Sequence, residues 1–98
     1  MKIQLERIQN NQVVETLSLE QPVIKIGRLK SAHVLLDDKT VSRIHCVLHS
    51  KNGEVQLVDM GSSSGTFVNG EKVTKCQLKV GDTIQLGETF LKISFGNN

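Results

Sequence analysis

The sequence has few aromatic side chains and no basic run, and both features argue against nucleic acid as its main ligand. It contains three Phe, no Tyr and no Trp, so a platform on which bases could stack is poorly supplied. The net charge is only +2, from 12 basic and 10 acidic residues, and the lysines are scattered along the chain. Nucleic-acid-binding domains usually carry a larger basic excess on one face. We therefore expect no nucleic-acid partner.

The sequence is also poor in cysteine, with Cys46 and Cys76 alone and no CxxC motif. This excludes a zinc knuckle or a thioredoxin-like site. His45 and His49 fall in a predicted strand, where four residues span about 13 Å, too far for one metal ion to bridge. We expect two reduced thiols that pack as small hydrophobic side chains, no bound metal and no cofactor.

Long hydrophobic segments are absent as well. The N-terminal residues alternate between polar and apolar types and lack the apolar run of a signal peptide. No stretch approaches the length of a membrane span. A chain of 98 residues, 38% of them hydrophobic, can bury one core. We expect one domain over 1–98, ordered from about 2 to 95 with a tail at 96–98. We expect it to be monomeric, cytoplasmic and without a membrane partner.

Strand patterns replace the helical periodicity that the sequence lacks. Runs rich in Val, Ile, Leu, Thr and Phe alternate with Gly, Asn and Asp, which is typical of an all-β sandwich. Two Asn-Gly pairs are strong hairpin signals, and Asn10-Asn11 is a third turn. We expect Val13 to share one strand face with Leu17 and Leu19. Counting the less distinct runs, we predict about ten or eleven strands, of which the clearest cover 2–8, 13–19, 23–27, 34–36, 45–50, 55–59, 66–68, 83–86 and 89–95.

Residues of the kind used in catalysis are present, but not in a catalytic pattern. Ser42, His45 and Asp59 could compose a triad, yet no G-x-S-x-G motif accompanies them. The loop at 61–66 lacks the spacing and the Lys of a nucleotide-binding phosphate loop, and no predicted helix follows it. The sequence therefore favours a binding module over an enzyme.

Three polar segments supply groups suited to a phosphate. Gly27-Arg28 ends one predicted strand, Ser42-Arg43-Ile44-His45 opens another, and 62–70 forms a loop, a short strand and a turn. Arg offers a rigid fork of donors that matches phosphate oxygens, and Ser hydroxyls add short hydrogen bonds. Any one segment alone would indicate only a loop rich in Ser and Gly.

Together, the three segments resemble the forkhead-associated (FHA) domain family. Its pattern is Gly-Arg, then Ser-Arg-x-His, then Asp-x-x-Ser-x-Asn-Gly-Thr-x-x-Asn-Gly, and here the last part runs from Asp59 to Gly70. Residues 78–84 also look like the family. The resemblance implies a SMAD/FHA-like β-sandwich of about eleven mostly antiparallel strands, with ligand loops at one end. It also implies binding of phosphothreonine peptides, a mode of recognition that uses Arg clusters.

The resemblance also implies roles for individual residues. Arg28 and Ser42 would hold the phosphate, Arg43 would add a polar contact, and Ser63 would help close the pocket. Ser64 stands where the family has Asn and would keep one hydrogen bond with a shorter reach. The remaining residues are Asn69, which would bond to the peptide main chain, and the supporting Gly27, His45, Gly65 and Thr66.

The function that follows is a non-catalytic phosphothreonine reader that recruits a phosphorylated protein in kinase signalling. The partner would be a Ser/Thr kinase substrate or the kinase itself. The alternative is a structural FHA domain that assembles with other proteins independently of phosphate. A phosphatase is a further alternative, although the chain lacks a plausible nucleophile–base pair.

Overall fold

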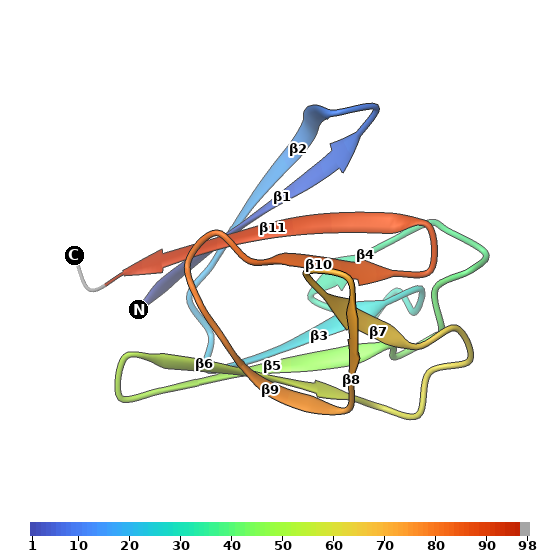
Figure 1. The fold of residues 1–98 in the computed structure, drawn as a ribbon. Coiled ribbons are helices and arrows are strands. Elements are labelled where there is room, and N and C mark those ends of the chain that lie inside the picture. The colour runs from blue at the N-terminus through green and yellow to red at the C-terminus, as the bar shows by residue number, and fades with distance from the viewer. Residues whose placement is uncertain (97–98) are drawn as a thin grey trace.

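The computed structural model describes residues 1–96, in which eleven strands form two sheets packed face to face (Figure 1). This confirms the predicted all-β sandwich. The first sheet has six strands, and their order places the chain's first and last strands side by side. That order is β2 (Gln12–Leu19), β1 (Lys2–Gln9), β11 (Thr89–Gly96), β10 (Thr83–Leu86), β7 (Thr66–Val68) and β8 (Glu71–Val73).

The second sheet has five strands and carries the segments that lead into the polar loops. Its order is β4 (Val34–Leu35), β3 (Val23–Gly27), β5 (Cys46–Lys51), β6 (Glu54–Asp59) and β9 (Lys75–Leu78). β4 pairs with β3 in parallel, whereas the other strand pairs of residues 1–96 are antiparallel.

The core lies between the sheets and follows from the alternation of side chains along each strand. Ile3 and Leu5 face inward from β1, and Ile24 and Ile26 face inward from β3, all fully buried. Burying one such side chain stabilises the fold by about 1.5–3 kcal/mol. The other fully buried aliphatic side chains are Val34, Leu48, Val55, Leu57, Ile84, Leu86, Leu91 and Ile93.

The hairpin turns confirm the Asn and Asn-Gly signals. Asn52 and Gly53 join β5 to β6 with φ of 54° and 78°, and Lys51 pairs with Glu54 across the turn. Residues 69–70 and 10–11 also have positive φ at both positions. Two-residue turns of this kind match the twist of antiparallel strands, and Asn and Gly tolerate positive φ best.

Two expectations about strand faces and ends were wrong. The β1–β2 register shifts between Arg7 and Ile8, so Val13 pairs with Ile8 and leaves the face that Leu17 and Leu19 share. Val13 is consequently 50% exposed. Gly96, expected to begin a tail, is the last residue of β11 and pairs with Lys2. The rest of the predicted tail, residues 97–98, lies outside the described residues.

Both thiols are free. Cys46 is buried in the core and Cys76 is half-buried. Burial raises the pKa of the Cys46 thiol, and the negative charge of Asp59 on the paired strand adds to that effect. Cys46 therefore behaves as a small core side chain. Within residues 1–96 there is no helix of the length and apolar character needed to cross a membrane.

Candidate functional site

Three loops meet at one end of the sandwich (at the right in Figure 1). Side chains of these loops line a polar groove. The loops follow β3, connect β4 to β5, and connect β6 to β7. The groove has a volume of about 630 Å³. Its polar lining comes from all three loops and comprises Arg28, Lys39, Thr40, Ser42, Arg43 and Ser63.

The groove is positively charged. Arg28, Lys39 and Arg43 line it, and the described residues of its lining include no carboxylate. The Nε atom of Arg28 donates a hydrogen bond to the carbonyl of Val41, which fixes the guanidinium at the groove wall. Since Arg and Lys stay ionised at neutral pH, the groove presents fixed positive charge together with hydroxyl groups. This combination suits a phosphorylated ligand.

Gly27 allows two of the loops to approach each other closely. The backbone N–H groups of Arg28 and Leu29 donate to the carbonyls of Ser42 and Arg43, at 3.2 and 3.1 Å. A Cβ atom on residue 27 would lie 2.0 Å from the Arg43 carbonyl oxygen, far inside van der Waals contact. The backbone arrangement beside Arg28 therefore requires glycine at position 27.

His45 links the second loop to the third from a fully buried position. Its Nδ1 atom accepts a hydrogen bond from the Ser42 N–H at 3.0 Å. Its Nε2 atom lies 2.8 Å from the Gly65 carbonyl oxygen, which can only accept. The network therefore assigns the proton to Nε2 of a neutral imidazole. Gly65 itself has φ of +84°, a conformation that favours glycine.

The serines join the loops to each other. The Ser63 N–H donates to the Ser42 hydroxyl oxygen at 3.0 Å, so the Ser42 O–H keeps its capacity to donate to a ligand. Ser64, at the family's Asn position, donates its hydroxyl hydrogen to the Thr40 carbonyl at 2.8 Å. Ser42 and Ser63 line the groove, whereas Ser64 lies beside it and connects its walls.

Asp59 organises the third loop, a role that sequence reasoning missed. Its carboxylate accepts hydrogen bonds from the Gly61 and Ser62 N–H groups at 3.0 and 3.1 Å, and also from the Ser62 hydroxyl. The buried Thr66 hydroxyl donates to it at 2.7 Å. Burial by itself would raise the pKa of Asp59, but these hydrogen bonds outweigh it and lower the pKa. The sequence signal that could have indicated this role is an Asp at the start of a loop with a Ser three residues later, since Asp side chains often accept hydrogen bonds from the backbone of such loops.

Asn69 lies apart from the groove lining. It is exposed at the β7–β8 turn, where its Nδ2 donates to Asp82 at 2.9 Å and its Oδ1 accepts from the Thr83 N–H at 3.0 Å. The side chain therefore ties this turn to the start of β10. Its contact with a bound peptide stays a prediction.

The profile of the FHA domain family matches residues 24–87, a span that contains every predicted site residue. The chain belongs to the FHA domain family. The glycogen accumulation regulator GarA of Mycolicibacterium smegmatis is 44% identical over 70 residues, which cover 71% of this chain and 44% of GarA. The chain spans about half the length of the curated relatives it matches.

Solved FHA domains share the whole sandwich. One comes from a structural and functional analysis of phosphothreonine-dependent FHA domain interactions. It has a TM-score of 0.89 and 28% identity, with 100% of both chains covered. Another is Mycobacterium tuberculosis EmbR in complex with a low-affinity phosphopeptide. It has a TM-score of 0.86 and 26% identity, and covers 99% of this chain and 26% of that one. These similarities confirm the predicted FHA-type fold.

Proposed function

We propose that this FHA domain reads phosphothreonine on a partner protein and does so without catalysis. The observation that carries the proposal is the positively charged groove, in which Arg28, Ser42, Arg43 and Ser63 converge from three loops. A phosphate at neutral pH carries nearly two negative charges and strong acceptor oxygens. The two guanidinium groups and the Ser42 hydroxyl match both properties.

Four groove residues, together with Asn69 outside the groove, have roles in this proposal. Arg28 and Ser42 hold the phosphate, and Arg43 adds a charge at the groove wall. Ser63, whose N–H already positions the Ser42 hydroxyl, closes the pocket. The Asn69 amide bonds to Asp82 and Thr83 through one N–H and one oxygen lone pair. Its second N–H and second lone pair would bond to the peptide main chain.

The partner is a protein phosphorylated on threonine by a Ser/Thr kinase, or the kinase itself. The solved neighbour with a bound phosphopeptide and the relative named as a regulator support this partner class. We propose that the domain acts as a monomer in the cytoplasm, without nucleic acid, membrane or cofactor. Incubation with a phosphothreonine peptide should release no inorganic phosphate, and measurable turnover would favour the phosphatase alternative.

The proposal is tested by calorimetry with a phosphothreonine peptide selected from a degenerate library, together with its unphosphorylated form. We expect a Kd of about 1–10 μM for the phosphorylated form and a shift towards millimolar in Arg28→Ala, because a bidentate charged contact is lost. Lys51→Ala is the matched control, since Lys51 lies beside the β5–β6 turn at the opposite end of the sandwich. Equal binding of both peptide forms would instead favour a structural FHA domain.

A further inference from the structure

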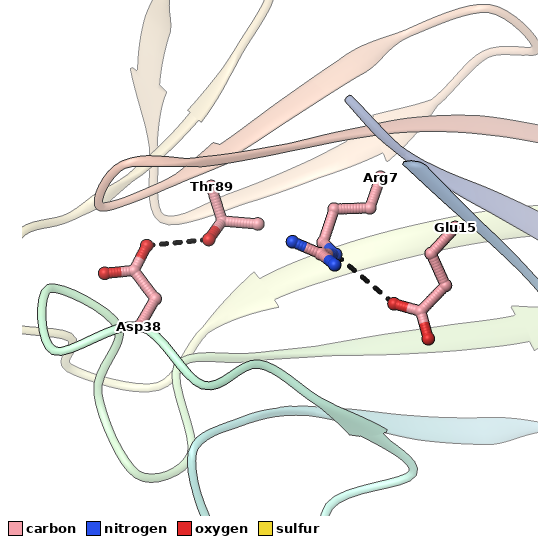
Figure 2. Close-up of polar contacts among 4 residues, drawn as sticks. All are labelled: Arg7, Glu15, Asp38 and Thr89. Atoms are coloured by element: carbon pink, nitrogen blue, oxygen red, sulfur yellow. Dashed lines mark hydrogen bonds and ion pairs between the residues drawn. The ribbon is translucent and has the colours of Figure 1, made fainter. Parts of the chain in front are cut away.

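Beside the phosphate groove lies a second network of hydrogen bonds, which we call the threonine clamp. It consists of Asp38, Thr40, the backbone N–H of Glu88, and Thr89. Asp38 Oδ1 accepts from the Thr40 N–H at 2.8 Å and from the Thr40 hydroxyl at 2.6 Å. Its Oδ2 accepts from the Thr89 hydroxyl at 2.7 Å, as Figure 2 shows. One carboxylate thus joins the β4–β5 loop to the first residue of β11.

Thr40 occupies the centre of the clamp. Its hydroxyl donates to Asp38 and accepts from the Glu88 N–H at 2.8 Å, so both capacities of the oxygen are used inside the protein. The turn before Glu88 packs so closely that a Cβ atom on Gly87 would lie 2.1 Å from Thr40 Oγ1 and 2.6 Å from its carbonyl oxygen. Gly87 also has φ of +58°. The turn between β10 and β11 is therefore shaped to hold Thr40.

The clamp is connected to the phosphate groove through three consecutive residues. The Thr40 carbonyl accepts from the Ser64 hydroxyl at 2.8 Å. The next carbonyl, that of Val41, accepts from Nε of Arg28. The next residue, Ser42, accepts the Ser63 N–H on its hydroxyl. A displacement of Thr40 would therefore move the anchors of the phosphate-binding residues on all three loops.

The clamp is centred on a charged acceptor, the Asp38 carboxylate. Burial by itself would raise the pKa of Asp38, but hydrogen bonds from Thr40 and Thr89 outweigh it and lower the pKa, so the carboxylate stays ionised. Hydrogen bonds to a charged acceptor are stronger than neutral ones. The Arg7–Glu15 ion pair on β1 and β2, 3.2 Å long and also drawn in Figure 2, is exposed and contributes little by comparison.

We propose that Asp38 and Thr89 are positioning residues for phosphate recognition, which set affinity by fixing Thr40 and do not touch the ligand. The proposal rests on the proposed function, because its readout is phosphopeptide affinity. Glu88 and Thr89 lie just beyond residues 24–87, the span that the FHA profile matches.

The test compares Thr89→Val, which removes the hydroxyl and keeps the shape, with Thr89→Ser, which keeps the hydroxyl. Thr16→Val is the matched control on the exposed face of β2. Affinity for the phosphothreonine peptide is measured by calorimetry at a temperature where circular dichroism shows all variants folded. We expect Thr89→Val to bind about fivefold more weakly, equivalent to ~1 kcal/mol, while the other two bind as the wild type does.

A double-mutant cycle with Ser64→Ala separates positioning from general destabilisation. If the clamp acts through the Thr40 carbonyl, Thr89→Val should weaken binding less once Ser64→Ala has broken that link, so the two effects should not add. Equal affinity of Thr89→Val and wild type would overturn the clamp while leaving the phosphothreonine reader intact. Strict additivity in the cycle would overturn the connection through the Thr40 carbonyl and Ser64. If the wild-type domain bound the phosphorylated and unphosphorylated peptides equally well, both proposals would be overturned.

Discussion

The two ends of the sandwich reach their conformations by different means. At the β5–β6 end, two adjacent residues, Asn52 and Gly53, define the turn through their backbone conformation. At the groove end, side chains far apart in the sequence define the loops. His45 bonds across 20 residues to Gly65, and Asp38 bonds across 51 residues to Thr89.

This difference explains why the same kind of substitution should have different consequences at the two ends. A change in the β5–β6 turn alters a local backbone preference and leaves the rest of the sheet in place. A change in the groove loops removes an anchor shared by two or three loops, so ligand-binding groups move together. Phosphopeptide affinity should therefore respond to the groove end much more than to the turn end.

Among substitutions that leave the phosphate-binding side chains unchanged, the largest effect on affinity is expected for Gly27→Ala. The added Cβ would overlap the Arg43 carbonyl oxygen, so the loop that carries Ser42 must move away from Arg28. We expect phosphopeptide affinity to fall by roughly 100-fold or more, which corresponds to ~3 kcal/mol. Overpacking of this kind also destabilises a fold by about 1–3 kcal/mol. Calorimetry and urea denaturation measure the two effects, and wild-type affinity in a folded Gly27→Ala variant would contradict the described loop approach.

A smaller effect is expected for Asp59→Asn, which disturbs one loop only. An Asn at this position keeps one acceptor for the Thr66 hydroxyl, but its amide group would face the donors of Gly61 and Ser62. We expect about tenfold weaker phosphopeptide binding, and a free energy of unfolding lower by about 1–3 kcal/mol at pH 7. Unchanged affinity would mean that the 60–65 loop holds its shape without Asp59.

Asp59 also predicts a pH dependence of stability. Its pKa is lowered in the folded state, so its contribution is present above the unfolded value of about 3.9 and is lost as pH falls through the folded pKa. The stability gap between wild type and Asp59→Asn should therefore be widest at neutral pH and shrink below pH 4. Urea denaturation at pH 7, 5 and 3 measures it, and a gap that stays constant would show that ionisation of Asp59 is not what the loop depends on.

The sequence predicted the fold well wherever a local signal sufficed. The Asn-Gly turns and β3 follow from residue type and alternation, which depend on neighbours in the chain. Val13 was assigned to the wrong face because a register shift depends on the partner strand, which the β2 sequence does not contain. β8 and β9 were not placed individually, since segments of three and four residues are too short to show a clear alternation of polar and apolar side chains.

The candidate site also contains some residues with a local sequence signal and others whose role depends on a distant partner. Arg28, Ser42, Arg43 and Ser63 were predicted from segments that each contain recognisable residue types, and the structure brings them to one groove. The anchors behind them were missed, because Asp38 and Thr89 acquire their connection only when two distant loops meet. Pairing of that kind leaves no trace in the spacing of residues along a single segment.

A still smaller difference is expected between phosphothreonine and phosphoserine peptides of matched sequence. The family resemblance implies that the threonine γ-methyl occupies a small apolar niche beside the phosphate. Burial of one methyl group is worth roughly 0.8 kcal/mol, or about fourfold in affinity, and the stiffer threonine rotamer adds to the preference. Competition of the two peptides for the wild-type domain measures the ratio. Equal affinities would show that the methyl group stays in solvent.

The smallest effect on affinity is expected for Asn52→Ala at the opposite end. Asn52 has φ of 54°, a left-handed conformation that costs a residue such as Ala about 1 kcal/mol more than Asn or Gly. The β5–β6 turn should therefore lose about that much stability in urea denaturation. Phosphopeptide affinity should stay within about twofold of the wild type, because sites without shared contacts behave independently. A large loss of affinity would show that the turn is coupled through β5 to His45 and the groove, and the two ends would then have to be regarded as one cooperative unit.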